Sequence, residues 1–500
     1  MVLAAISGAV ANAATYYVSP AGSDSDPGSR AKPWQTVARV NAADLEPGDR
    51  VLFQGGAAFK GTVKLNAKHS GTPGKKVEFS SYGKGRATID GGNISAFTSR
   101  RCSHFAISNL NFVGSGRKGG NTERGVFLAD GDDVVVDQVA VSGFRGSGLL
   151  LAGVRDARAT HVYAHDNGAD GIAVGAAGER PGDRWSERVY IGYCLAENNP
   201  GDPSNLENHS GSGIVVGGVR DCLIEYCEAM NNGWDMPRKG NGPVGIWAWN
   251  ADRVVIQFCV AHDNKSPGWD GGGFDLDGGV TNSIMQSNYS YNNQGPGYFL
   301  CQYPTGPVWK NNIVRYNISV NDGGKNNVGC GLEVYGGDER ISDAEVYNNT
   351  VYNTKGGAVG FGGLPAPRIR FRNNIFVTTG ELIRGDASPA RFEGNLYWSL
   401  GPDGSIAAGH KTLAEWAEAT GQEKANGKLI GLYADPLLTR AGTMPAVKPV
   451  DLSKLTAYRL RAGSPCLKAG LIIENNGGRD FWGGKAPKAH KPSIGACQGP

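Results

Sequence analysis

Three carboxylates have a spacing that could support acid–base chemistry. Asp275 and Asp277 alternate with apolar residues, and Glu333 takes the matching place in a similar run further along. Alternate residues of a β-strand share a face about 6.6 Å apart, so this pair would lie side by side. Repulsion between them should raise one pKa and leave the other low, as an acid and a base require. With Asp270, the pair would also suit Ca²⁺, which prefers oxygen ligands.

These carboxylates belong to a repeat of short alternating strands joined by Gly- and Asn-rich turns. Equivalent positions recur every 29 to 33 residues, at Asp166, Asn198, Asn231, Asp263, Asn292, Asn321 and Asn353. Such a period indicates a solenoid, and the absence of helical periodicity favours a parallel β-helix. Asn suits this column because it tolerates left-handed turns and its amide can bond the rungs above and below.

The strand after each turn predicts a core face and an open face. Ile172, Val174, Ile214, Val216, Ile246, Ala248, Phe274, Leu276, Tyr298, Leu300, Leu332 and Val334 would point inward. The open face would carry Ala173, Gly175, Val215, Gly217, Trp247, Trp249, Asp275, Asp277, Phe299, Cys301, Glu333 and Tyr335. Stacked rungs lie about 4.8 Å apart, which puts Glu333 roughly 10 Å along the axis from Asp275.

Aromatic residues on this open face predict a groove for sugar rings. Trp247, Trp249 and Tyr335 would offer flat apolar platforms, unless the loop at residues 233–241 covers the tryptophans. Trp269, Lys239 and His209 would contribute from neighbouring loops. We expect no cation on the open face of the strands, which favours a largely neutral glycan.

The whole chain resembles the right-handed parallel β-helix superfamily of pectate lyases and polygalacturonases. The resemblance implies an all-β fold with an N-terminal capping helix and first rungs (residues 15–80), a parallel β-helix (81–400) and a C-terminal closing segment (401–500). Gly-Gly-Phe-Asp-Leu at 272–276 is similar to a segment of family-nine pectate lyases, whose aspartates bind Ca²⁺ and whose lysine abstracts a proton. Phe299 stands at that lysine position here, and Lys239 and Lys265 are the nearest substitutes.

Composition and the N-terminal sequence indicate which ligands the protein does not bind and where it is located. The net charge of +3 indicates neither nucleic-acid nor dedicated polyanion binding, and no apolar run is long enough to span a membrane. Residues 1–14 read as a signal peptide, truncated at its start, so we expect secretion to the periplasm or the outside of the cell. Of nine cysteines, Cys194, Cys227 and Cys259 look like buried free thiols, whereas Cys466 and Cys497 form the one candidate disulfide.

Three functions follow from these residues. The first is a polysaccharide-degrading glycoside hydrolase that needs no cofactor, with Asp275 and Asp277 as the acid–base pair and Glu333 assisting or replacing one of them. The second is a Ca²⁺-dependent polysaccharide lyase or epimerase with Asp270, Asp275 and Asp277 on the metal. The third is a non-catalytic glycan-binding β-helix. Each takes a polysaccharide or oligosaccharide as its ligand, and the chain could be a monomer or a trimer.

Overall fold

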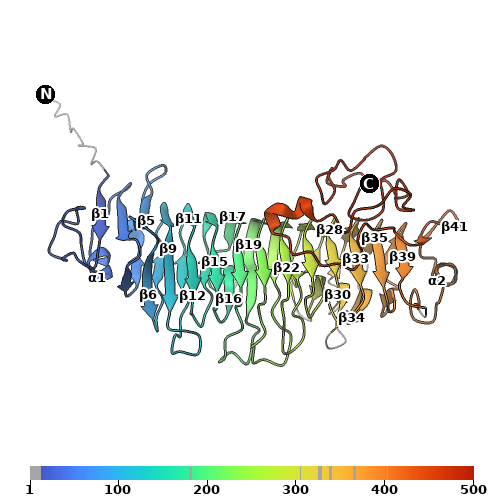
Figure 1. Ribbon diagram of the computed structural model, residues 1–500, viewed down its shortest axis with the longest axis horizontal. Coiled ribbons are helices and arrows are strands. Elements are labelled where there is room, and N and C mark those ends of the chain that lie inside the picture. Colours follow the sequence, from blue (N-terminus) through green and yellow to red (C-terminus); the bar gives the residue numbers. More distant parts are fainter. Residues whose placement is uncertain are drawn as a thin grey trace.

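The computed structural model describes residues 13–178, 183–303, 306–324, 329–336, 341–363, 368–402 and 404–499. Most of the predicted signal peptide lies outside these ranges. The chain winds into one long parallel β-helix, with the strands stacked along the long axis of the molecule (Figure 1). The expected all-β fold is therefore confirmed. In the described part of the chain, no helix is long and apolar enough to cross a membrane.

Each turn contributes strands to three stacks, of which the first two are joined through β19 (Ser212–Glu225) and β21 (Ile246–Gln257) into one 24-stranded sheet and the third forms a 14-stranded sheet. We treat the three stacks as separate sheets, and the first carries the face that the sequence predicts to be open. Its strands are β4 (Val63–Leu65), β7 (Phe97–Arg100), β10 (Val126–Ala129), β13 (Leu149–Ala152), β16 (Asp170–Gly175), β19 (Ser212–Glu225), β21 (Ile246–Gln257), β23 (Phe274–Leu276), β26 (Tyr298–Gln302), β30 (Cys330–Gly336), β34 (Gly357–Gly363) and β37 (Ile383–Arg384). We call it the first sheet.

The second and third sheets complete each turn. The second contains β1 (Thr15–Val18), β2 (Arg50–Gln54), β5 (Val77–Tyr82), β8 (Phe105–Ser108), β11 (Val134–Asp137), β14 (Arg155–Thr160), β17 (Ser186–Gly192), the later halves of β19 and β21, β24 (Ile284–Gln286), β28 (Ile313–Arg315), β32 (Ala344–Tyr347), β35 (Ile369–Arg372) and β38 (Arg391–Glu393). The third contains β3 (Ala58–Lys60), β6 (Ala87–Gly92), β9 (Leu110–Gly114), β12 (Ala140–Ser142), β15 (Tyr163–His165), β18 (Leu195–Glu197), β20 (Glu228–Met230), β22 (Val260–His262), β25 (Tyr289–Tyr291), β29 (Ile318–Val320), β33 (Thr350–Asn353), β36 (Ile375–Thr378), β39 (Leu396–Ser399) and β42 (Leu432–Tyr433). Short pairs lie outside these sheets: β27 (Trp309–Lys310) with β31 (Ile341–Ser342), and β40 (Lys424–Ala425) with β41 (Lys428–Leu429).

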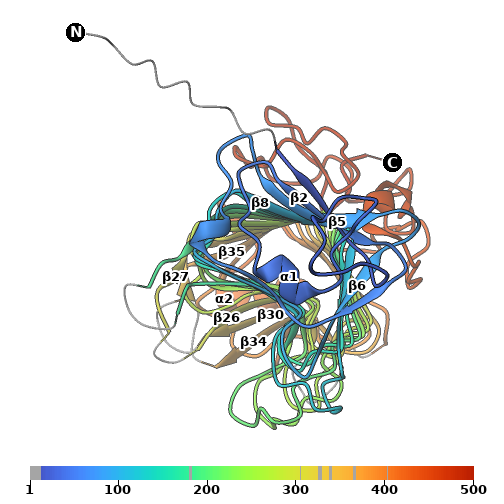
Figure 2. The same cartoon turned by 90° about the vertical axis from the view of Figure 1, so that its left-hand side faces the viewer.

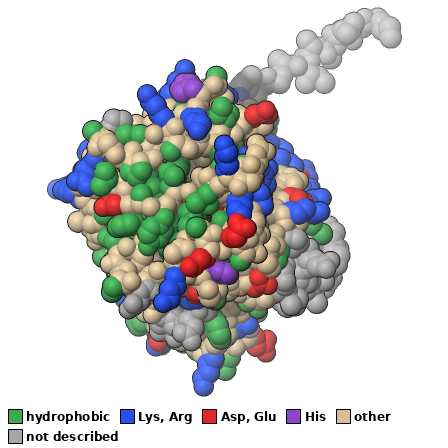
Figure 3. Space-filling view, turned by 90° about the vertical axis from the view of Figure 1, so that its right-hand side faces the viewer, with side chains coloured by type: hydrophobic (Ala, Val, Ile, Leu, Met, Phe, Trp, Pro, Cys, Tyr) green, Lys and Arg blue, Asp and Glu red, His purple; other side chains and the backbone are tan. Residues whose placement is uncertain are grey.

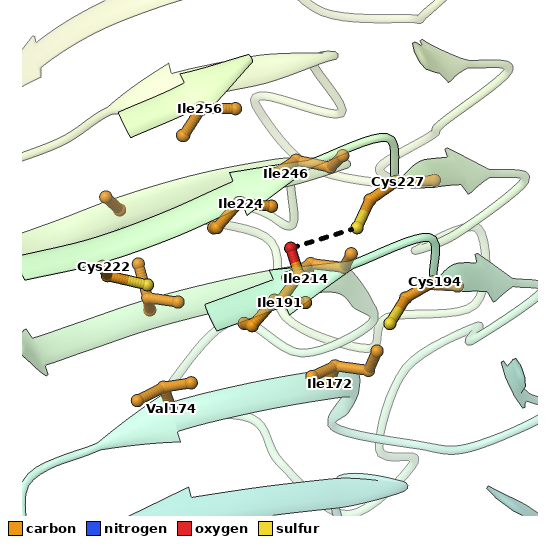
Figure 4. Packing of buried hydrophobic residues seen from close by; sticks show 14 of the residues in the cluster. Ile172, Val174, Ile191, Cys194, Ile214, Cys222, Ile224, Cys227, Ile246 and Ile256 are labelled. Atoms are coloured by element: carbon orange, nitrogen blue, oxygen red, sulfur yellow. Dashed lines mark hydrogen bonds between the residues drawn. The ribbon is translucent and has the colours of Figure 1, made fainter. Parts of the chain in front are cut away.

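The core is a continuous stack of aliphatic, aromatic and cysteine side chains inside the helix. All twelve residues predicted for the core face of the first sheet are buried. Ile172, Ile214 and Ile246 stack rung upon rung, with the thiols of Cys194 and Cys227 beside them (Figure 4). The Cys227 thiol donates to the carbonyl of Ile191 at 3.7 Å. The prediction of buried free thiols at Cys194, Cys227 and Cys259 is confirmed.

Asparagines fix the turns that follow the third sheet. The predicted column adopts left-handed backbone angles from Asp166 to Asn321, as expected, although Asn353 does not. The buried amide ladder lies one residue further along, where Asn199, Asn232 and Asn264 each donate to the next side chain at 2.9 Å. The ladder ends on the carboxylate of Asp322, because the last amide needs an acceptor.

Both ends of the solenoid are covered. Helix α1 (Val37–Asn41) buries Val37 and Val40 and lies across the N-terminal opening (Figure 2). Helix α2 (Leu413–Thr420) buries Trp416 at the other end (Figure 1). Hydrophobic side chains gather on that C-terminal face (Figure 3).

The closing segment then returns along the outside of the solenoid. Its 3₁₀-helix (Pro449–Lys454) follows Lys448, which pairs with Glu228 of β20 at 2.8 Å. A second 3₁₀-helix (Ala67–His69) lies near the N-terminal end. Cys466 and Cys497 are both free thiols, so the predicted disulfide between them is not formed.

Candidate active site

Strand register confirms that the predicted residues share one outward column of the first sheet, but its members from Ala173 to Glu333 are buried, so the column is not open as predicted. Along the first sheet, Ala173 pairs with Val215, which pairs with Trp247, followed by Asp275, Phe299 and Glu333. The column extends beyond the sequence prediction, since Glu333 pairs with Gly360 and Gly360 with Arg384. Asp275 thus lies two rungs from Glu333 and one from Trp247.

The aspartate pair occupies the middle of this column. Asp275 is 3% exposed, and its Oδ1 has no hydrogen-bond partner among the described residues. Asp277 follows strand β23, and its Oδ1 accepts from the Gly278 amide at 2.6 Å. Asp270 lies in the preceding loop, where its Oδ2 accepts from the Gly242 amide at 2.8 Å. Asp275 therefore has one buried oxygen without a hydrogen-bond partner among the described residues.

Burial raises the pKa of all three carboxyls. The pKa of Asp275 lies well above its usual value because the charges of Asp277 and Asp270 add to the effect of burial. Burial raises the pKa of Asp277 to about 6 and that of Asp270 to about 7. The prediction that one pKa of the pair stays low is wrong, because the loops beside the sheet desolvate both groups. The charges of the neighbouring aspartates add to burial at Asp275 and favour its protonated form.

The two tryptophans of the column differ in their surroundings. Trp249 is 40% exposed, and its indole lies over Gly217, where an added Cβ would come within 2.3 Å of Nε1. Trp247 is only 4% exposed, because it packs against Val215 and Val244 and donates to the Ser212 hydroxyl at 3.0 Å. The expectation that Trp247 is an exposed sugar platform is wrong, whereas Trp249 has the required exposure.

Loops bring some of the remaining predicted residues near the pair. The His209 ring lies 5.0 Å from the Trp247 ring, centroid to centroid. Burial and the charge of Arg238 lower the pKa of His209 to about 4, so its imidazole is neutral at neutral pH. Trp269 precedes Asp270 and is 53% exposed. Lys239 is an exposed residue of the neighbouring loop.

Glu333 is directed away from the aspartates. Its carboxylate is 4% exposed and pairs with Arg384 at 3.1 Å. It lies across Gly360, where an added Cβ would come within 2.1 Å of Oε2. Glu333 therefore forms its own buried ion pair and does not join Asp275 and Asp277 in the structure. Tyr335, two residues on, is 39% exposed.

Binding of Ca²⁺ by Asp270, Asp275 and Asp277 stays a prediction. Within the described ranges, no group of three or more His, Cys, Asp or Glu side chains converges closely enough to hold a metal ion. Asp270 is bound by a backbone amide, and Phe299 is buried at the position of the lyase lysine. Lys265 donates to Asn231 at the turn after the third sheet, so it is no substitute.

Sequence reasoning missed several contributors to the site. The Cys301 thiol bonds the Asp277 carboxylate and could have been noticed from its place in the column. Tyr303 lies over Gly278, beyond the end of strand β26, where alternation no longer applies. Arg384 and Arg238 bring positive charge to the face and its loops. The expectation that strands of this face carry no cation is therefore wrong.

The fold and the site define a parallel β-helix with a desolvated carboxylate pair on the outward side of its first sheet. A family model described as "Pel9A-like, right handed beta helix region" matches residues 16–327, and the chain belongs to this family. The match contains Asp275 and Asp277 and ends before Glu333. The resemblance inferred from the sequence is confirmed.

Known proteins similar to this chain include enzymes with different activities in their names. The lacto-N-biosidase of Bifidobacterium longum subsp. longum is 23% identical over an alignment 613 residues long, gaps included, that covers 97% of this chain. The chain spans only about a third of that relative, 36% of its length. A GH136 lacto-N-biosidase from Eubacterium ramulus superposes with a TM-score of 0.52 at 18% identity, over 71% of this chain and 67% of that one. The PL6 family alginate lyase AlyGC gives 0.53 at 14% identity, over 88% and 58%. The two structures show likeness of fold.

Proposed function

We propose that this protein is a carbohydrate-active enzyme, and within that class a glycoside hydrolase that uses Asp275 and Asp277. The observation that carries the proposal is the pair itself: two neighbouring carboxyls on the outward side of the first sheet, both with raised pKa values, of which Asp275 has an oxygen without a hydrogen-bond partner among the described residues. The exposed indole of Trp249 stands in the neighbouring rung as a platform for a sugar ring. Similarity to lacto-N-biosidases supports this assignment.

Each carboxyl has a separate role in the reaction. Burial and the neighbouring charges favour the protonated form of Asp275, whose O–H donates to the glycosidic oxygen while the bond from that oxygen to the anomeric carbon breaks. Asp277 is ionised above a pH of about 6 and takes a proton from the water that attacks the anomeric carbon. Asp277 directly follows strand β23, and residues two apart on an extended backbone lie about 6.6 Å from each other, close to the 6.5–9.5 Å of inverting enzymes. A closer approach of the carboxyls would instead make Asp277 the nucleophile of a retaining reaction.

A Ca²⁺-dependent lyase or epimerase is the second candidate. Three carboxylates, one with an oxygen that lacks a partner, are favourable to a hard cation in principle. A lyase also needs a base to abstract a proton, and Phe299 occupies the position of the lysine that serves family-nine pectate lyases. For this reason we place hydrolysis first.

One assay separates these candidates. The protein is incubated with a panel of plant, algal and microbial glycans and a lacto-N-biose-terminated oligosaccharide, with and without chelator. New reducing ends without ultraviolet absorbance, insensitive to chelator and lost in Asp275→Asn, are expected. The matched control is Asp221→Asn, which removes an exposed carboxylate of the second sheet.

Two results would overturn the hydrolase proposal. Absorbance from an unsaturated product that requires Ca²⁺ would establish the lyase. Binding of a glycan by both the protein and Asp275→Asn, with no turnover of any glycan in the panel, would establish a non-catalytic binding protein.

A further inference from the structure

A cluster of basic side chains around one phenylalanine lies on the first sheet, toward its N-terminal end. Lys64 pairs in register with Thr98, and Thr98 with Phe127. From Phe127, the same column runs through Leu150 and three further rungs to Asp275. Five rung spacings of about 4.8 Å put Phe127 roughly 24 Å from Asp275 along the axis. A glycan of several sugar units lying on this sheet would reach both places.

Two guanidinium groups flank the Phe127 ring. The Cζ of Arg100 lies 4.9 Å from the ring centroid, and that of Arg124 lies 5.4 Å from it. The ring quadrupole attracts each cation, so one aromatic side chain holds two like charges near each other. Their mutual repulsion falls when an anion lies between them. An anion that bound between the two guanidinium groups would therefore be attracted by both of them.

These cations differ from the arginines of the second sheet in forming no direct ion pair within the described ranges, although the charge of Arg124 acts on the buried carboxyl of Asp170. Arg188 pairs with Asp156 at 2.7 Å, and Arg253 pairs with Asp221 at the same distance. Within the described ranges, Lys64, Arg100, Arg101 and Arg124 form no ion pair. The arginine charges of the second sheet are thus neutralised by direct ion pairs, whereas within the described part of the chain the basic groups around Phe127 form none.

The cluster lines a surface hollow that is open to a ligand. Lys64, Arg100, Arg101 and Arg124 line it, together with Phe127 and one acidic residue, Glu123. All four basic residues are exposed, and Phe127 forms part of the floor. Arginine recognises a carboxylate or sulfate through paired, charge-assisted hydrogen bonds, which a neutral sugar cannot form.

We propose that this hollow is a distal subsite for a negatively charged sugar unit, one that carries a carboxylate or a sulfate ester. The proposal rests on the proposed function, because the charged unit belongs to a long glycan whose scissile bond lies at Asp275. The distal subsite holds the chain in place five rungs from the reaction. It also selects glycans that are charged at a distance from the bond that is cut.

Binding to a catalytically inactive protein tests the proposal independently of turnover. Calorimetry with Asp275→Asn compares a uronic-acid oligosaccharide, a sulfated galacto-oligosaccharide and an uncharged oligosaccharide of the same length. At least one charged probe should bind more tightly than the uncharged one, and the one that does identifies the anion. Adding Arg100→Gln and Arg124→Gln should weaken that binding on the order of tenfold. Binding of the uncharged probe should not change.

The control removes the same charge elsewhere. Arg188→Gln with Arg253→Gln lowers the net charge equally and should leave binding of the charged probe unchanged. The proposal is overturned if this control weakens binding as much as the Arg100 and Arg124 changes do, or if all three probes bind alike. Equal affinity for single-stranded nucleic acid would also overturn it, since the hollow would then attract any polyanion. Failure to find a hydrolysed substrate bears on the proposed function, whereas these binding results bear on the subsite.

Discussion

Replacing Asp277 by asparagine should abolish activity and stabilise the fold at neutral pH. Unfolded aspartate loses its proton near pH 4, whereas folded Asp277 keeps its proton to a pH of about 6. Between these values the folded state binds more protons, so the stability of the wild-type protein falls as the pH rises. The rise in pKa from 3.8 to about 6 corresponds to about 3 kcal/mol. Asparagine does not titrate, and its oxygen can still accept from the Gly278 amide.

Urea unfolding of both proteins at pH 4 and pH 7.5 measures this effect. The stabilities should be similar at pH 4, and Asp277→Asn should gain up to about 3 kcal/mol at pH 7.5. Activity should fall by about 10²- to 10⁴-fold in the same variant. Asp221→Asn is the matched control with the opposite sign, because Arg253 holds the pKa of Asp221 below its usual value. A lower stability of Asp277→Asn at neutral pH, or retained activity, would refute the reasoning.

Four further outcomes follow from the site. The pH profile of kcat/KM should rise around pH 6 as Asp277 ionises and fall at higher pH as Asp275 loses its proton; a flat profile would contradict these roles. Trp249→Ala should raise KM up to about tenfold with little change in kcat, as expected of a stacking platform. Trp247→Ala should instead destabilise the protein by about 3 to 5 kcal/mol in urea unfolding, because it empties a packed site. Arg384→Met should cost about 1 to 3 kcal/mol in the same assay, since the buried carboxylate it pairs with is left without a partner; unchanged stability would show that this ion pair is dispensable.

The features that the sequence predicted depend on strand alternation. Ile214 and Ile246 are buried, and Val215 and Trp247 are register partners on the other face, because a rung that slipped by one residue would turn apolar side chains outward. Repetition then extends the same register from rung to rung. The left-handed turn at Asn231 was predictable for a similar reason, since few residue types accept that backbone conformation.

The features that the sequence did not predict depend on segments outside the repeat. Trp247 is buried because Val244 and the loop that carries His209 pack against it, and both lie in insertions of irregular length. Burial also desolvates Asp277, and this desolvation raises the pKa of its carboxyl. Alternation assigns a side chain to a face, but it does not say what lies above that face.

Glycines decide the direction of the side chains around the aspartate pair. Trp249 lies over Gly217, on the N-terminal side of its rung, and Glu333 lies over Gly360, on the C-terminal side of its own. In both cases the missing Cβ leaves the room into which the larger side chain turns. The two side chains thus turn in opposite directions, each away from the rungs that carry Asp275 and Phe299. Gly217 and Gly360, one rung beyond Trp249 and Glu333, therefore set the direction of these two side chains.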